Sequence, residues 1–340
     1  MRKIINIALT VTLVIVAGVV VALIVRDLYS LETLMPSPTP VSSPTPVVLA
    51  SPTPTPMPVA SGPVLRFVDF GDWGNKSSID TETFRQLERT HASLGFTDII
   101  TNGDNNYGSA ETFDAYVQRE FGQLLAGGVK LHMSLGNHDV ENDAKIQGQV
   151  GNPVYGEWDC RECLRARTGL SGNRYYSIYR APVRFIMLDS NLMLKGDTDQ
   201  YGWVVQELMA SNAANEPWQV LVFHHPPFSS AQTHGGIQQI VDQYKSVLTR
   251  LGVDVVLNGH DHVYERIKTT PACGAGVQYI VIGTPDLRRG DVKTPSACSD
   301  FFWDQMQAFL YVTVTPKNFS AQVITKDGTV VDTWEISHPN

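Results

Sequence analysis

Hydrophobic and polar positions follow a repeated pattern from about residue 64 onward. A short apolar run is followed by a loop rich in Gly, Asp, Asn or His, and then by a more polar segment. Short apolar runs predict buried strands, and polar segments with apolar positions three and four residues apart predict amphipathic helices. We expect strands at 64–70, 96–102, 130–136, 184–190, 218–224 and 253–259. We expect helices at 78–95, 199–213 and 236–252.

The helix ends and the C-terminal strands carry local signals. Gly95 is placed to end the first helix, and Asp199 is placed to cap the second. Toward the C-terminus, apolar and polar residues alternate as in antiparallel strands, with a turn at 326–328. These strands are expected at 278–283, 309–316, 319–325 and 329–336. The whole pattern predicts an α/β domain with mixed sheets over residues 64–338.

The first 63 residues have a different composition. Residues 4–25 form an almost unbroken apolar run, close to the roughly 20 residues that span a bilayer as a helix. The run exceeds the hydrophobic region of a cleaved signal peptide, and no small-residue cleavage pattern follows it. We therefore expect a cytoplasmic stub at 1–3 and an uncleaved transmembrane signal anchor at 4–25. A cleaved signal peptide, and hence secretion, is the alternative.

A linker rich in Pro, Thr and Ser is expected at residues 26–63. Its proline-rich part, PSPTPVSSPTPVVLASPTPTPMPVASGP, lacks the apolar residues that a core requires and favours an extended, polyproline-like chain. Between an anchor and a globular segment, such a chain is typical of a spacer. The sequence thus predicts a single-pass protein of the cell membrane with its globular domain outside the cytoplasm.

The net charge of the chain limits the kinds of partner that it can bind. The chain has a net charge of -8, and the globular part holds the whole negative balance. A nucleic-acid-binding surface would be basic, so nucleic acid is not expected as a partner. An anionic substrate would instead need a local cation, such as a metal ion.

Four cysteines are present, which suggests two disulfides in an extracytoplasmic domain. The simplest pairing joins Cys160 to Cys163 and Cys273 to Cys298. A zinc site of four cysteines is the alternative, although an oxidising location disfavours free thiols.

Five polar loops follow predicted strands, at the edge where open α/β sheets present their sites. Six of the nine histidines lie in these loops or at His234. Carboxylates, an amide, imidazoles and a phenol, without thiolate, suit Fe, Mn or Zn. Any one loop alone would be interpreted as a polar turn, but together they indicate a metal site. The loops are DFGDWGN with Asp72, NGDNNY with Asp104 and Tyr107, LGNHD with Asn137, His138 and Asp139, VFHHPP with His224 and His225, and NGHDH with His260 and His262.

Neighbouring residues on an extended chain point to opposite faces, so one site uses His224 or His225 but not both. The strand pattern leaves that choice open.

Taken together, GDWG, GDNNY, GNHD, the His before HP, and GHDH resemble the five signature blocks of the calcineurin-like metallophosphoesterases. Tyr107 makes the set similar to the purple acid phosphatases, and the short length is similar to their small, mammalian-type form. The resemblance covers about residues 65–335. It implies a four-layer αββα sandwich of two mixed sheets flanked by helices.

The resemblance also implies a binuclear site and roles for its residues. Asp104 would bridge a ferric ion and a second divalent ion (Fe, Zn or Mn), and a metal-bound hydroxide would attack phosphorus. His138 would protonate the leaving group, Asp139 would orient His138, and His234 would face the substrate. His225 receives no role. The implied ligands are Asp72, Asp104, Tyr107 and His262 for the ferric ion, and Asp104, Asn137, His224 and His260 for the divalent ion.

The expected function is that of a membrane-tethered, extracytoplasmic acid phosphatase that hydrolyses phosphate monoesters as a monomer. A phosphodiesterase or nucleotide hydrolase on the same centre is one alternative. A surface binding protein that retains the metal site is an alternative of another class.

Overall fold

The computed structural model describes residues 62–74, 81–108, 112–141, 149, 174–283 and 294–338. The predicted stub, the predicted anchor, nearly all of the linker and the Cys160–Cys163 pair lie outside these ranges. Within these ranges, no helix has the length and apolar character needed to cross a membrane.

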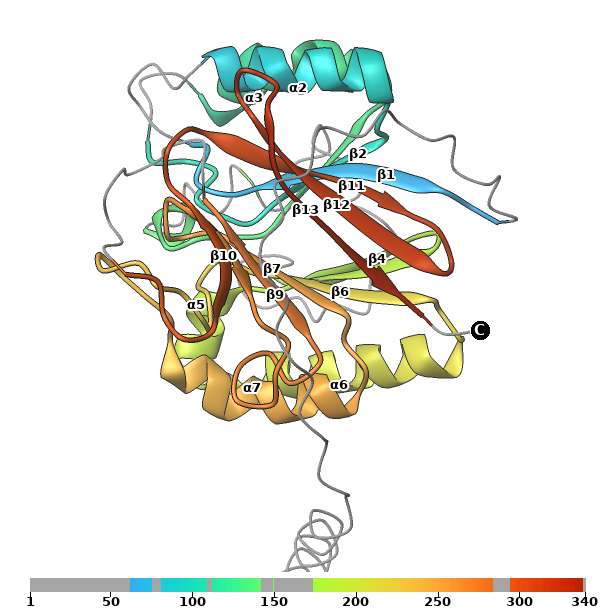
Figure 1. The fold of residues 1–340 in the computed structure, drawn as a ribbon, viewed down its shortest axis with the longest axis vertical. Coiled ribbons are helices and arrows are strands. Elements are labelled where there is room, and N and C mark those ends of the chain that lie inside the picture. The colour runs from blue at the N-terminus through green and yellow to red at the C-terminus, as the bar shows by residue number, and fades with distance from the viewer. Residues whose placement is uncertain are drawn as a thin grey trace, which may run out of the picture. The chain divides into compact units, whose positions relative to one another are not determined.

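The domain contains two mixed sheets (Figure 1). The six-stranded sheet has the order β13-β12-β11-β1-β2-β3, in which β1, β2 and β3 are parallel and the other neighbours are antiparallel. Its strands are β1 (Leu65–Phe70), β2 (Asp98–Thr101), β3 (Lys130–Met133), β11 (Ala308–Val314), β12 (Asn318–Thr325) and β13 (Val330–Ser337).

The seven-stranded sheet has the order β10-β8-β9-β7-β6-β5-β4, with parallel neighbours from β9 to β5. Its strands are β4 (Tyr176–Arg180), β5 (Val183–Met187), β6 (Trp218–Val222), β7 (Val255–Asn258), β8 (Tyr264–Ile267), β9 (Gln278–Ile282) and β10 (Ser299–Trp303).

Helices cover the outer faces of both sheets (Figure 1). The helices α2 (Thr81–Leu94) and α3 (Phe113–Ala126) lie over the six-stranded sheet; α5 (Ser190–Leu194), α6 (Thr198–Ala213) and α7 (Gln238–Arg250) lie over the other. Buried aromatic rings join the two sheets: Phe67 in β1 packs edge-on against Phe185 in β5, with ring centroids 5.1 Å apart. The predicted four-layer αββα sandwich is confirmed.

Two sequence predictions need correction. The side chain of Asp197, not Asp199, caps α6 by accepting a hydrogen bond from the backbone N of Gln200. Because the helix begins one residue earlier than predicted, Asp199 falls in its first turn. The segment at 278–283 forms β9, which is antiparallel to β8 but parallel to β7 and therefore belongs to the other sheet from β11–β13.

The strand order brings the carboxyl ends of both parallel regions together. The backbone N of Gly71, after β1, donates to the carbonyl of Ile282 at the end of β9, over 2.8 Å. The side chain of Asn102, after β2, donates to the carbonyl of Asn258 at the end of β7, over 3.2 Å. The polar loops of the two sheets therefore meet at one edge.

Cys273 and Cys298 form the predicted disulfide, with their Cα atoms 5.5 Å apart. The bond closes a segment with a sequence separation of 25. For a loop of this length, the restriction of the unfolded chain contributes about 3 kcal/mol. The double substitution Cys273→Ala/Cys298→Ala should lower the free energy of unfolding by about that amount in urea denaturation. A variant as stable as the unmodified protein would contradict this prediction. As a control, a reductant should lower the free energy of unfolding of the unmodified protein far more than that of the variant.

Candidate metal centre

Three strand-end loops place two carboxylates and an imidazole around one point. Asp72 follows β1, Asp104 follows β2 and His224 follows β6, and all three side chains are buried. One ligand atom from each lies within 4.8 Å of the other two. Such a buried group of two acids and a histidine is suited to a cation, because unneutralised carboxylates are costly away from water.

The backbone is strained at three of the predicted ligands. Asp72, Asp104 and His260 have φ angles of 61°, 52° and 72°, in the left-handed region that non-glycine residues seldom adopt. Each such residue costs on the order of 1–3 kcal/mol and persists where the surroundings hold it, often at functional sites. The strained positions therefore coincide with residues of the proposed site.

His224 lies at the centre of the predicted divalent half. Its Nε2 is 3.1 Å from Oδ1 of Asn137, 3.2 Å from Nδ1 of His260 and 3.3 Å from Oδ2 of Asp104. Its Nδ1 lies 2.9 Å from the carbonyl of Asn102, which orients the ring with Nε2 toward the other ligands.

The predicted ferric half gathers around Asp72. The hydroxyl of Tyr107 donates to Oδ1 of Asp72 over 3.2 Å, and Nε2 of His262 lies 3.4 Å from the same oxygen. The backbone N of His260 donates to Oδ2 of Asp72 over 2.8 Å and links the two halves. The structure thus brings all seven predicted ligands into one network.

The electrostatics of the network indicate a place for positive charge. Burial alone would lower the pKa of His224, but the carboxylates of Asp104 and Asp72 raise it to about 10. Burial alone would raise the pKa of Asp104, but the charge of His224 holds it below its ordinary value. Burial raises the pKa of Tyr107, and Asp72 and Asp104 raise it further. The carboxylates therefore favour a cation at Nε2 of His224, and a metal ion would compete there with the proton. The donor set fits such an ion.

The His138 imidazole has a neighbour that the sequence did not predict. The structure places Oε1 of Glu141, rather than Asp139, beside the ring, 2.6 Å from Nδ1. Sequence adjacency suggested Asp139, but the 3-10 helix η2 (His138–Val140) places a residue three positions along on the same side as His138.

The buried Asp139 instead joins two loops. Its carboxylate accepts hydrogen bonds from the backbone N of Gly136, Asn105 and Asn106 at 2.8, 3.1 and 2.9 Å, and from Nε2 of Gln149 at 2.9 Å. Burial and the charge of Asp104 raise its pKa to about 7. Asp139 therefore fixes the Asp104 loop relative to the Asn137 loop.

Sequence reasoning missed the supporting amides of this site. Asn102 and Asn105 are fully buried, and Nδ2 of Asn105 donates to the carbonyl of Ser134 over 2.7 Å. Their only sequence signal was their position beside Asp104 in the same polar block.

His225, which received no role, and His234, which was expected to face the substrate, differ in exposure. His225 is buried, with Nδ1 2.7 Å from Oγ of Ser190, so it packs behind the ligands. His234 is exposed, and its ring centroid lies 4.1 Å from that of His260. The site can therefore be reached by a ligand beside His234.

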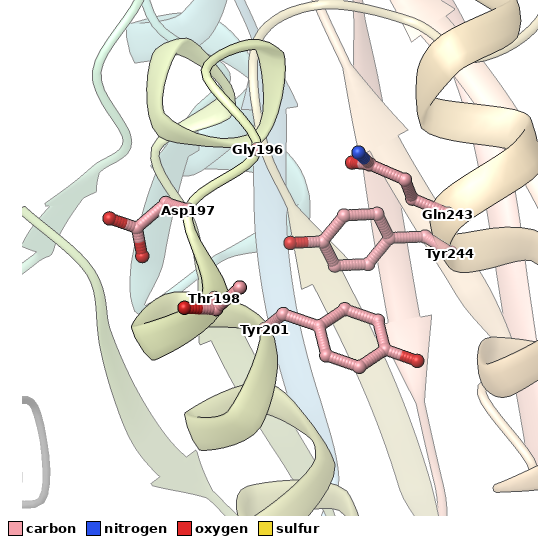
Figure 2. A pocket seen from close by; sticks show the side chains of 6 residues that line it. All are labelled: Gly196, Asp197, Thr198, Tyr201, Gln243 and Tyr244. Carbon is pink, nitrogen blue, oxygen red and sulfur yellow. The ribbon is translucent and has the colours of Figure 1, made fainter.

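A separate cavity of about 240 Å³ lies between α7 and the start of α6 (Figure 2). Tyr244 from α7 faces the turn at Gly196 there, and none of the proposed metal ligands lines it. The cavity therefore adds nothing to the metal centre.

Gly136 approaches Asp104 too closely to accept a side chain. A Cβ added there would overlap Oδ1 and the backbone N of Asp104. Gly136→Ala should therefore lower the free energy of unfolding by about 3 kcal/mol in urea denaturation and displace Asp104. Gly202→Ala is the matched control, because the added methyl meets nothing within 4 Å on α6; it should stabilise by about 0.5 kcal/mol. Equal effects of the two substitutions would contradict this prediction.

Comparison with known proteins identifies the family of this chain. The family model described as calcineurin-like phosphoesterase matches residues 65–264. Purple acid phosphatase 21 of Arabidopsis thaliana is 32% identical over 234 residues, which cover 66% of this chain and 51% of that protein. The chain thus spans about half the length of this relative. Tartrate-resistant acid phosphatase type 5 of Mus musculus is 24% identical over 311 residues, covering 79% of this chain and 89% of the relative.

Two solved structures share the fold. Purple acid phosphatase PPD1 from yellow lupin (Lupinus luteus) seeds has a TM-score of 0.64 at 19% identity, covering 82% of this chain and 54% of its own. The protein described as "GAP50 the anchor in the inner membrane complex of Plasmodium" has a TM-score of 0.65 at 16% identity, and the match covers 82% of this chain and 90% of that protein. At these identities the likeness concerns the fold alone.

Proposed function

Because the chain belongs to the calcineurin-like phosphoesterase family, with purple acid phosphatases among its relatives, we propose that it is a metal-dependent phosphatase acting on phosphate monoesters. The observation that carries the proposal is the single network formed by Asp72, Asp104, Tyr107, Asn137, His224, His260 and His262.

The proposed ligand sets differ in charge. Asp72, Asp104, Tyr107 and His262 would hold a ferric ion, since two carboxylates and a phenolate offset a trivalent charge. Asn137, His224 and His260, with Asp104 shared, would hold a divalent ion. When bound, the two ions would offset the charge of the phosphate oxygens and lower the pKa of a coordinated water.

Two histidines beside the ligands have proposed roles toward the substrate. His138 would donate a proton to the leaving oxygen, for which imidazole is suited because its pKa lies near working pH. The exposed His234, next to His260, would contact the phosphate.

We also propose that residues 4–25 tether the domain to the cell membrane and that the domain faces an extracytoplasmic compartment. The Cys273–Cys298 disulfide supports the second point, because such bonds persist in oxidising compartments. Recovery of the full chain in the membrane fraction would support the tether, and recovery of an N-terminally shortened chain in the medium would support cleavage.

The test of the proposed activity combines a visible absorption spectrum, metal analysis and rates on two esters, all on the full chain. A violet protein that contains iron and prefers p-nitrophenyl phosphate to bis(p-nitrophenyl) phosphate supports the proposal, and Tyr107→Phe should remove the colour. A colourless zinc or manganese protein that prefers the diester would favour a phosphodiesterase. Bound metal without hydrolysis of either ester would favour a binding protein.

A further inference from the structure

Glu141 holds one nitrogen of the His138 ring. Its Oε1 lies 2.6 Å from Nδ1 of His138, at an i, i+3 spacing across η2. An ionised carboxylate only accepts hydrogen bonds, so Nδ1 must carry the hydrogen in this pair. Proton exchange between the ring and another group then runs through Nε2.

Two further contacts restrict the same residue. The backbone N of His138 donates to Oδ1 of Asp104 over 2.9 Å. The ring of Tyr107 lies against that of His138, with centroids 4.5 Å apart and planes 41° apart. His138 is therefore held by its backbone, by a ring face and by Nδ1, and the contact with Glu141 favours the tautomer with the hydrogen on Nδ1.

We propose that Glu141 is a positioning residue that keeps the hydrogen of His138 on Nδ1 and directs proton transfer through Nε2. The proposal rests on the function proposed above. As the ester P–O bond breaks, its electron pair remains on the leaving oxygen, which takes the Nε2 proton of the imidazolium. The Nδ1 hydrogen stays in the hydrogen bond to Glu141 throughout the transfer.

The competing explanation is an ordinary surface ion pair. The side chains of His138 and Glu141 are 39% and 47% exposed, and exposed pairs contribute little to stability, about 0–1 kcal/mol. A stability measurement therefore cannot separate the two explanations. The dependence of the hydrolysis rate on the leaving group can separate them, because a poor leaving group needs a proton to depart and a good leaving group needs it less.

The experiment compares β-glycerophosphate, an alkyl ester, with p-nitrophenyl phosphate, an activated aryl ester, on the full chain. Glu141→Ala should lower kcat for the alkyl ester about tenfold and for the aryl ester less than about twofold. Glu141→Gln should recover part of the alkyl rate, because its amide oxygen can still accept from Nδ1. The control is Glu82→Ala, which removes an exposed carboxylate 3.6 Å from Nζ of Lys326 and should change neither rate.

Two further measurements test whether Glu141 acts through His138. In a His138→Ala background, Glu141→Ala should cause no additional loss, since the residue it positions is gone. Nitrogen NMR of histidine-labelled, metal-free protein should show His138 protonated at Nδ1, and a mixture of tautomers in Glu141→Ala.

Different results would overturn different proposals. Equal losses on both esters, additive losses in the double variant, or an unchanged tautomer would each overturn the positioning role and leave the phosphatase function standing. Absence of hydrolysis of both esters by the unmodified, metal-loaded protein would overturn the phosphatase function and the positioning role with it.

Discussion

Asp104→Asn is expected to remove most of the bound metal and to lower kcat for phosphate monoesters by about 10³-fold. Oδ2 of Asp104 lies 3.3 Å from Nε2 of His224, and burial leaves little water to replace the lost charge. A metal centre contributes several kcal/mol to transition-state stabilisation, and each 1.36 kcal/mol corresponds to about a factor of ten in rate. Metal analysis after dialysis and steady-state kinetics measure the two effects.

Asp69→Asn is the matched control for that substitution. Asp69 is fully buried three residues before Asp72, and burial raises its pKa well above the ordinary value. A protonated Asp69 resembles Asn in charge and shape, and Oδ2 accepts from Nδ2 of Asn102 over 3.1 Å, as an amide oxygen could. Metal content and kcat should therefore stay within about twofold. If Asp104→Asn retains metal and rate as Asp69→Asn does, the proposed bridging role is wrong.

His138→Ala is expected to lower kcat for β-glycerophosphate by about 10²-fold, with a smaller loss for p-nitrophenyl phosphate and no loss of metal. The substitution removes the imidazole but keeps the backbone N–H that donates to Asp104 over 2.9 Å. The ligand geometry should therefore survive while proton donation is lost. Rates on the two esters, measured beside metal content, separate the two effects.

His91→Ala serves as the control for His138→Ala. His91 lies on α2, and its ring centroid is 4.9 Å from that of Phe96. Its replacement should alter stability slightly and leave both rates unchanged. Loss of metal in His138→Ala would show that the imidazole supports the centre itself, and the assignment of His138 as proton donor would then fail.

The choice between His224 and His225 shows the limit of what sequence periodicity can predict. Alternation along the strand predicted that only one of them enters the site, and the family resemblance favoured His224. In the structure, Nδ1 of His225 is 2.7 Å from Oγ of Ser190, behind the cluster, while His224 contacts Asn137, Asp104 and His260. The direction of each side chain depends on the loop after β6, which no local pattern specifies.

The carboxylate beside the His138 ring is a second contact that the sequence did not predict. Both Asp139 and Glu141 are carboxylates close to His138 in sequence. A short 3-10 helix brings Glu141 to the ring, whereas the carboxylate of Asp139 accepts hydrogen bonds from backbone N–H groups of two loops. Sequence distance could not separate them, because the outcome depends on one turn of backbone and on a loop from another strand.

The sequence by itself determined the α/β class, most strand positions and the residue types available for a metal, because periodicity and side-chain chemistry are local properties. Only the tertiary structure decided which nitrogen faces which oxygen. The deciding contacts join residues far apart in the chain, such as the backbone N of His260 and Asp72, separated by 188 positions, and Asn102 and Asn258, separated by 156. Such contacts exist only when the carboxyl ends of two sheets meet. The geometry of the site therefore depends on how the whole domain packs.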